Sequence, residues 1–381
     1  MKCWRNAAFA IAALAILLLM LAQIRQRPFV WNLPDNVPRP VVPADNPMNR
    51  YKVELGRRLF YDVRLSVNES FSCASCHLQA LAFTDGRKQA IGATGELHPR
   101  GSMSLVNAAY ASRLTWANNL LSRLEDQALT PMFGETPVEM GMSGLENRII
   151  SVLRSDARYQ KLLPRAFPGD ADPYSVLNTV RCIASFVRTI VSFDAPYDRY
   201  LRGDPAAMTE SQLRGMDLFF SERLECFHCH GGFNFTDSSS HENTLVESVG
   251  FHNNGLYNIE NTGAYPQKNT GLYELTGNRR DMGRFKAPTL RNIGLTAPYM
   301  HDGSLESLDD VIEHYRNGGR TVATGPHAGD GSRNPYKSVF VREFELSDSE
   351  KDDLLAFLQS LTDESVIENP DFADPFAGDR H

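Results

Sequence analysis

The chain has 381 residues, with 39 Lys and Arg against 46 Asp and Glu, and a formal net charge of -7. This length is enough for two domains, and no basic tract points to nucleic-acid binding. Six acids but only one arginine follow Leu361, so the acidic excess lies mainly at the C-terminal end. We therefore expect residues 362–381 to form a mobile acidic tail.

The N-terminal residues have the layout of a secretory signal. Lys2 and Arg5 precede an unbroken apolar run from Ala7 to Ala22. The run is short for a membrane span, which needs about 20 residues. Because no small-x-small cleavage site follows it, an uncleaved anchor in the inner membrane is an open alternative. In both cases residues 1–24 direct the rest of the chain to a bacterial periplasm.

Two stretches, FSCASCHLQA and LECFHCHGGF, repeat the order Cys, two residues, Cys, His. The motif residues are Cys73, Cys76 and His77 in the first copy and Cys226, Cys229 and His230 in the second. Two thiols at this spacing can attach one haem covalently, and the adjacent His can bind its iron. A four-thiolate zinc site would leave each His without a role, and a redox dithiol would not need two copies. The sequence therefore predicts two covalently bound c-type haems.

Helical patterns accompany both motifs. YKVELGRRLFYD precedes the first copy and ESQLRGMDLFF the second, while SDSEKDDLLAFLQSL follows with Ser347 as N-cap and Glu350 at the capping-box position. Cys182 lies in the apolar stretch TVRCIASFVRTIVSF and is expected to be a buried free thiol. The pattern indicates a mainly α fold of two cytochrome c-like haem domains with long loops. We place them at residues 45–204 and 205–361.

The segment APYMHDGSLESLDDVIEHYRNGG offers candidates for the remaining axial ligand of the second iron. These candidates are Met300, His301, His314 and Tyr315. We expect Ser304 to cap a helix whose apolar positions are Leu305, Leu308, Val311 and Ile312. At about 100° per residue, Tyr315 lies roughly 30° from the centre of that apolar face and His314 roughly 130° away. The helix thus favours Tyr315 as the inward side chain, and a Tyr that merely packs in the core is the alternative.

Several further segments carry a family resemblance. RRLFYDVRLS, SCASCH, AFTDG, LEDQALTPMFGETPVEMG, SFDAPYDRYLRGD, CFHCHGG and FKAPTLRNIGLTAPYMHDGSL occur in this order. Together they resemble the bacterial di-haem cytochrome c peroxidase and MauG superfamily, from about Tyr51 to about Leu361. The resemblance implies an enzyme with two facing haem domains. One haem reacts with hydrogen peroxide, and the other stores or relays oxidising equivalents.

The resemblance also suggests roles for individual residues. Counted from His301, the axial Met of the peroxidase branch falls on Tyr315, and MauG-like enzymes have Tyr at this position. An anionic oxygen ligand lowers the potential of iron, which favours MauG-like sharing of oxidising equivalents over both haems. Trp116 matches the Trp between the haems, although here Trp-Ala-Asn-Asn replaces the family's Trp-Asp-Gly-Arg. Glu139 matches the distal acid that moves a proton during O–O cleavage, and Gln127 and Pro131 match its neighbours.

Two features of the first haem site are less regular. His98 lies where a loop His blocks the iron in the resting peroxidase branch, but its spacing to the following SLVN differs, and we favour an open iron. The family's calcium ion takes carbonyl ligands that map to Thr296 and Pro298. The family's third ligand, an Asn, falls on Gly101, so calcium binding is an expectation from resemblance alone.

GATGELHPRGSMSLVNAAY, LTWANN and LEDQALTPMFGE resemble the MbnH-like branch, whose enzymes act with a small copper-associated periplasmic protein. This resemblance implies peroxide-dependent oxidation of a Trp of a partner protein to kynurenine. Two other functions stay open from the sequence. One is a peroxidase that reduces hydrogen peroxide to water with electrons from a small cytochrome or copper protein. The other is a non-enzymatic electron-transfer cytochrome.

Overall fold

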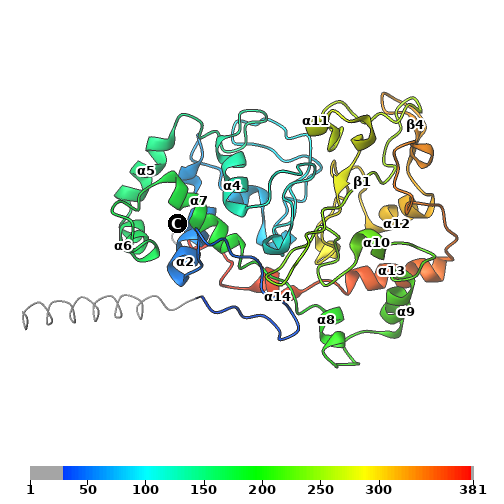
Figure 1. The fold of residues 1–381 in the computed structure, drawn as a ribbon, viewed down its shortest axis with the longest axis horizontal. Helices are drawn as coiled ribbons and strands as arrows, with labels where there is room; N and C mark the ends of the chain where they lie inside the picture. The colour runs from blue at the N-terminus through cyan, green and yellow to red at the C-terminus, as the bar shows by residue number, and fades with distance from the viewer. Residues whose placement is uncertain (1–28, 379–381) are drawn as a thin grey trace, which may run out of the picture.

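The protein, a computed structural model describing residues 29–378, is built from helices and long loops arranged in two lobes (Figure 1). The first lobe contains α2 (Arg50–Tyr61), α3 (Cys73–Cys76), α4 (Leu124–Phe133), α5 (Glu146–Ser155), α6 (Ala157–Ala166) and α7 (Val176–Val187). After α8 (Pro196–Leu201), the second contains α9 (Glu210–Phe219), α10 (Phe227–His230), α11 (Tyr273–Thr276), α12 (Leu308–Arg316) and α13 (Asp348–Gln359). The predicted mainly α architecture is confirmed.

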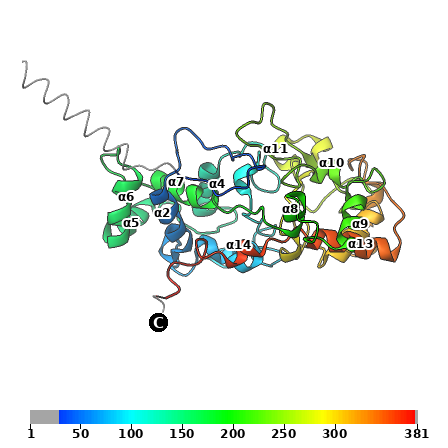
Figure 2. The same ribbon diagram turned by 90° about the horizontal axis from the view of Figure 1, so that it is seen from below.

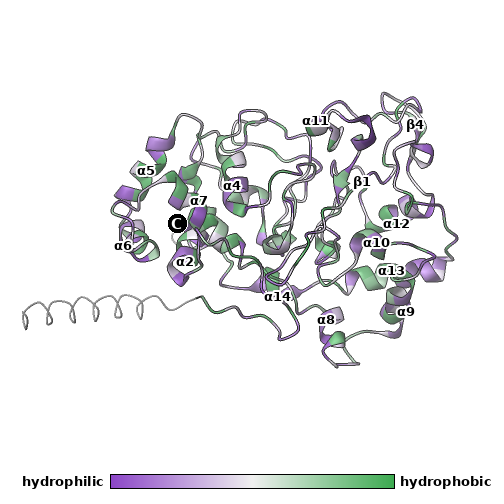
Figure 3. Cartoon of the chain, in the orientation of Figure 1, coloured by the Kyte–Doolittle hydropathy of each residue, from purple (hydrophilic) through white to green (hydrophobic). Residues whose placement is uncertain are grey.

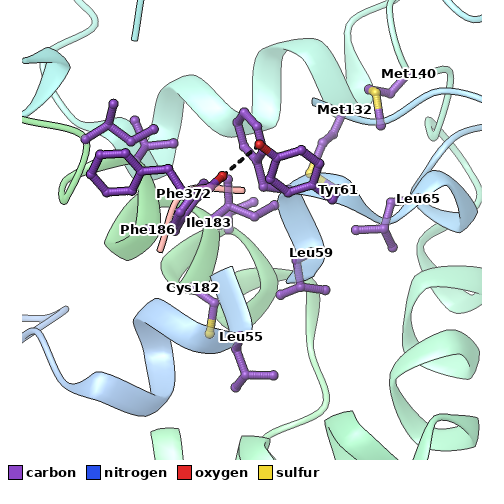
Figure 4. Close-up of a cluster of buried hydrophobic side chains, with 14 of the residues drawn as sticks. Leu55, Leu59, Tyr61, Leu65, Met132, Met140, Cys182, Ile183, Phe186 and Phe372 are labelled. Atoms are coloured by element: carbon purple, nitrogen blue, oxygen red, sulfur yellow. Dashed lines mark hydrogen bonds between the residues drawn. The ribbon is translucent and has the colours of Figure 1, made fainter. Parts of the chain in front are cut away.

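In the first lobe α2 packs closely against α7. Asn49 caps α2 by accepting from the backbone N–H groups of Tyr51 and Lys52, as an N-cap side chain should. A Cβ added at Gly56 would lie 1.9 Å from the carbonyl oxygen of Cys182, so only glycine permits this helix crossing. Cys182 itself is fully buried, as predicted. Figure 4 shows the apolar side chains of this core gathered around the helix pair.

The second lobe repeats this construction with α9 and α13. A Cβ at Gly215 would lie 1.9 Å from the carbonyl oxygen of Asp353. The predicted capping box of α13 is present, with Ser347 and Glu350 bonding each other's backbone N–H groups. Phe357 is fully buried in a second core, distinct from that of the first lobe. Most helices of both lobes carry hydrophilic and hydrophobic residues side by side (Figure 3), the pattern of surface helices packed on a core.

Two antiparallel pairs of two-residue strands complete the second lobe. β1 (Phe251–His252) pairs with β2 (Phe285–Lys286), and β3 (Thr321–Val322) pairs with β4 (Gly329–Asp330). Phe251 lies opposite Lys286 in the first pair. This first pair matters for function because its second strand contacts the first lobe, as described below.

The C-terminal segment differs from the mobile tail that its acidity predicts. After α13 the chain runs back beneath the molecule to the first lobe through α14 (Glu364–Glu368) (Figure 2). Val366 and Phe372 are 1% and 6% exposed and belong to the first core. The hydroxyl of Tyr61 donates to the carbonyl of Phe372 at 2.8 Å. Apolar side chains spaced among the acids therefore anchor this segment, a signal that net charge conceals.

The predicted export segment, residues 1–24, lies outside the described residues. Within residues 29–378, no helix combines the length and apolar character needed to cross a membrane. The division into domains at residue 204 stays a prediction.

Candidate active site

The two Cys-x-x-Cys-His motifs place their histidines in matching surroundings. Nδ1 of His77 lies 2.8 Å from the carbonyl oxygen of Phe83, and Nδ1 of His230 lies 3.2 Å from that of Phe235. A carbonyl oxygen can only accept, so each Nδ1 carries the proton and each Nε2 keeps its lone pair. This is the arrangement that metal-ligating histidines use, and both side chains fit a haem axial ligand.

The two accepting carbonyls are held by strained backbone. Phe83 and Phe235 are both 0% exposed and have φ values of 61° and 49°, in the left-handed region that favours glycine. Such a conformation costs on the order of 1–3 kcal/mol and persists only where surrounding packing enforces it. The same strain at both sites indicates that orienting each His is a shared requirement of the two lobes.

The motif cysteines form no disulfide with the described residues. Burial raises the pKa of Cys73 to about 12, that of Cys76 to about 11 and that of Cys226 to about 12. Among the described residues, the one group of three or more His, Cys, Asp or Glu side chains close enough to share a metal contains no cysteine. The four motif cysteines therefore do not converge on a zinc site.

A cavity of about 460 Å³ lies between the lobes and is lined by residues of both. Its walls include Cys76, His77, Trp116, Gln127, Glu139 and Met300. The volume falls in the range of roughly 300–1,000 Å³ typical of cofactor and ligand pockets. We call it the seam cavity. It brings together the first haem motif and the residues for which the family resemblance predicts a role.

Trp116 belongs to the first lobe but packs against the second. Its indole Nε1 donates to the carbonyl of Gly101 at 2.9 Å, and its own carbonyl accepts from the amide of Lys286 at 2.8 Å. The ring contacts a small cluster that includes Tyr257 and Phe285 of the second lobe. Trp116 is thus fixed at the junction of the lobes, where a residue that passes electrons between them would be needed.

Glu139 and its predicted neighbours line the first haem's side of the cavity. Burial raises the pKa of Glu139, and its carboxylate acts electrostatically on both Cys73 and Cys76. The Gln127 side chain extends from α4, and its buried Oε1 has no hydrogen-bond partner among the described residues. Pro131 follows one turn later in α4, and its carbonyl accepts from the Met140 amide beside Glu139.

Tyr315 faces the second haem motif from α12. Cys226 and Cys229 both act electrostatically on its phenol, and burial raises the pKa of Tyr315 to about 12. The cap of α12 is Ser307 rather than the predicted Ser304, because the backbone from Met300 to Ser304 forms a turn instead of starting the helix.

His314 is also buried, at 4% exposure, contrary to its predicted outward position. Its Nε2 lies 3.1 Å from the carbonyl oxygen of Asn254, in a loop that covers the second face of α12. A helical-wheel argument assumes that only one face of the helix is buried. It therefore cannot predict that a loop covers the opposite face.

The other candidate ligands have partners of their own. The Met300 sulfur lies 3.2 Å from the Asn254 amide nitrogen, and the His301 ring stacks on Phe285 with centroids 3.6 Å apart. Nδ1 of His98 accepts from the backbone N–H of Arg100 at 3.1 Å within its own loop.

The residues expected to bind calcium line the same seam cavity. Thr296 and Pro298 lie in its wall together with Gly101. The Gly101 carbonyl, at the family's third ligand position, already accepts from the indole of Trp116. The structure therefore brings the three positions to one cavity, and calcium binding stays a prediction.

Lys286 is a residue of the seam cavity that the sequence does not reveal. Lys286 is only 6% exposed and lines the cavity. The segment FKAPTLRN does not predict that Lys286 is buried, because a lone Lys is ordinarily a surface residue.

Two partly buried motif histidines with matching carbonyl partners, and a Trp at the junction of two helical lobes, are the features expected of a di-haem redox protein. Comparison with known proteins narrows this class. The family model for di-haem cytochrome c peroxidase matches residues 50–206. Cytochrome-c peroxidase IdrP1 of Pseudomonas sp. (strain SCT) is 35% identical, covering 84% of this chain and 83% of its own. Methylamine utilization protein MauG of Methylorubrum extorquens is 34% identical, covering 86% and 82%. The chain belongs to the di-haem cytochrome c peroxidase and MauG family.

Solved structures agree with this assignment. A MauG-like protein associated with microbial copper homeostasis superposes with a TM-score of 0.89 at 49% identity, over 91% of this chain and 99% of that one. The diheme peroxidase BthA of Burkholderia thailandensis shares the fold, with a TM-score of 0.64 at 20% identity over 91% and 96%. The protein is a peroxide-dependent di-haem oxidoreductase, and its family implies two haem cofactors.

Proposed function

We propose that this enzyme uses hydrogen peroxide to oxidise a side chain of a partner protein in the bacterial periplasm, converting a Trp to kynurenine. The observation that carries the proposal is Tyr315, which stands in place of the peroxidase-branch Met and faces Cys226 and Cys229. Support comes from the 49% identity to a MauG-like protein associated with copper homeostasis. That likeness favours a small copper-associated protein as the substrate.

The cofactors of this proposal are two haems attached through the four motif cysteines and bound by His77 and His230. When bound, they supply iron centres that accept oxidising equivalents from peroxide. Tyr315 completes the second site. Thr296 and Pro298 are proposed carbonyl ligands of a calcium ion at the seam, and residues 1–24 are the proposed export signal or anchor.

Glu139 supplies proton transfer in this proposal. Heterolytic O–O cleavage requires a group that takes a proton from one peroxide oxygen and returns it to the other. No hydrogen bond or ion pair reaches the Glu139 carboxylate from the described residues, and burial raises its pKa. A carboxylate with a raised pKa is a stronger base, as this task needs. In this proposal Gln127, whose buried Oε1 has no partner among the described residues, orients the oxygen that Glu139 serves.

Trp116 connects the lobes. Its indole is held by Gly101 and its backbone by Lys286, so the ring keeps one position at the junction. A fixed aromatic ring between two redox centres lowers the distance over which each electron must pass. In this proposal Trp116 lets the lobes share oxidising equivalents until the partner protein is oxidised.

A second candidate is peroxide reduction with electrons from a small cytochrome or copper protein. The 35% identity to cytochrome-c peroxidase IdrP1 favours it. Rapid oxidation of a reduced cytochrome by the enzyme and peroxide would support this candidate over the first. A non-enzymatic electron-transfer cytochrome fits less well, because the relatives of this chain include cytochrome-c peroxidases.

The experiment that tests the proposal begins with Tyr315→Phe in the haem-loaded protein. We expect the low-spin ferric signal of the second haem, recorded by electron paramagnetic resonance, to be lost. Tyr174→Phe, a first-lobe Tyr beside Arg154, is the matched control and should leave both signals intact. An unchanged signal in Tyr315→Phe would refute the ligand assignment and point to Met300 or His314.

The substrate is tested separately. Small exported proteins encoded beside the gene are incubated with enzyme and peroxide, and each Trp is followed by peptide mass spectrometry. Conversion of one Trp to kynurenine only when enzyme and peroxide are both present supports the proposal. Intact Trp residues alongside fast cytochrome turnover would favour the peroxidase.

A further inference from the structure

Lys286 occupies an unusual position in the seam cavity. It is the last residue of β2, opposite Phe251 of β1, and its backbone N–H donates to the carbonyl of Trp116 at 2.8 Å. The backbone of Lys286 is therefore held by both lobes. Its side chain lines the cavity and is 6% exposed.

The ammonium group of Lys286 lacks an acceptor. Nζ makes no hydrogen bond or ion pair with residues 29–378, whereas the equally buried Lys52 donates to Asn46 and to the carbonyl of Pro47, both at 2.9 Å. Asp237 is the acid that acts on Lys286 electrostatically. However, Oδ2 of Asp237 lies 2.6 Å from Nε2 of His252, and the acid forms no ion pair with Lys286.

An ammonium without a partner on a largely buried side chain is costly and is retained where an anion compensates it. Burial lowers the pKa of Lys286 to about 8, so near neutral pH the side chain still carries its charge. The cavity that receives this charge also contains Cys76 and His77 of the first haem motif. Haem carries carboxylate groups at its edge. Such a carboxylate could be the anionic partner that Nζ lacks.

We propose that Nζ of Lys286 pairs with a carboxylate of a haem bound in the seam cavity. Lys286 is then a positioning residue that fixes the edge of this haem beside Trp116. The inference rests on the haem occupancy in the proposed function. Lys286 belongs neither to the two Cys-x-x-Cys-His motifs nor to the group formed by Glu139, Gln127 and Pro131.

The pairing has an electrostatic consequence that can be measured without substrate. A positive charge near the haem stabilises the reduced iron, which carries less positive charge, and so raises the midpoint potential. Removing the charge also leaves the haem carboxylate unpaired and negative, which acts in the same direction. Loss of the Lys286 charge should therefore lower the midpoint potential of the haem it contacts.

The test is a spectroelectrochemical titration of both haems in the haem-loaded wild type, Lys286→Met and Lys286→Arg, without peroxide or partner. Lys161→Met, which removes an exposed lysine of α6, is the matched control. We expect Lys286→Met to lower the midpoint potential of one haem, Lys286→Arg to stay close to wild type, and Lys161→Met to match wild type. Unchanged potentials in Lys286→Met, or an equal decrease in Lys286→Arg, would overturn the proposal.

If Lys286→Met does not retain both haems, a crystal structure of the haem-loaded wild type decides. Nζ within about 3.2 Å of a haem carboxylate oxygen supports the pairing. Nζ bonded only to protein oxygens overturns it. Haem content of the wild type, measured by the pyridine haemochrome assay, separates this outcome from failure of the proposed function. A wild type without two haems contradicts the proposed function itself.

Discussion

Replacing Glu139 by Gln tests the proton-transfer role directly. The amide keeps the size of the side chain but cannot accept a proton from peroxide. No cation or hydrogen-bond donor among the described residues reaches the Glu139 carboxylate, and burial raises its pKa. The carboxylate is therefore the base that we expect to accept the proton of peroxide. General base catalysis typically contributes ~10²–10⁴-fold, and we expect the rate of the first reaction with peroxide to fall by that factor.

The assay is stopped-flow absorbance of the ferric, haem-loaded variant mixed with hydrogen peroxide across a pH series. Because the carboxylate is the active form, the wild-type rate should fall as pH drops through the raised pKa of Glu139, and the variant should lose this dependence. Glu135→Gln is the control, since the carboxylate of this exposed acid in the same loop bonds only Ser143 among the described residues. A Glu139→Gln variant that contains both haems and reacts at the wild-type rate would refute the reasoning.

Three further predictions concern the junction of the lobes, a buried ion pair and a helix crossing. Trp116→Phe should keep both haems but lose the near-infrared band of shared oxidation after peroxide; a persisting band would show that the lobes communicate by another route. Arg188→Met leaves Glu125 at 3% exposure without the ion pair that now measures 2.7 Å, so urea denaturation should show a loss of about 3–5 kcal/mol. Adding Glu125→Gln should recover part of that loss, and no recovery would argue against an unpaired charge as its cause. Gly215→Ala places a Cβ 1.9 Å from a carbonyl of α13 and should lower the melting temperature, whereas Gly169→Ala, with open space around it, should not.

The sequence predicts well what depends on short-range patterns. The two haem motifs, the helix before each of them and the capping box of α13 follow from spacing and local hydrogen bonding. Each helix crossing requires a glycine, Gly56 in ELGRRLF and Gly215 in LRGMDLF. This repeated glycine is a sequence signal from which the two crossings could have been predicted.

Features that depend on long-range packing were less accessible. His314 is buried because a loop around Asn254, distant in the sequence, covers α12. The acidic tail is ordered by Val366 and Phe372 meeting the first core, which net charge does not reveal. Lys286 is recognisable only from the missing acceptor, since burial and partners belong to the folded chain rather than to its sequence.

The most direct test of the central claim is the reaction of the fully ferric, haem-loaded enzyme with one equivalent of hydrogen peroxide and no reductant, followed by stopped-flow absorbance into the near infrared. We predict a fast Soret change and a long-lived near-infrared band, because the proposed function requires an open first site and oxidising equivalents shared by both lobes. Absence of reaction until one haem has been reduced would contradict this account and identify a peroxide-scavenging peroxidase.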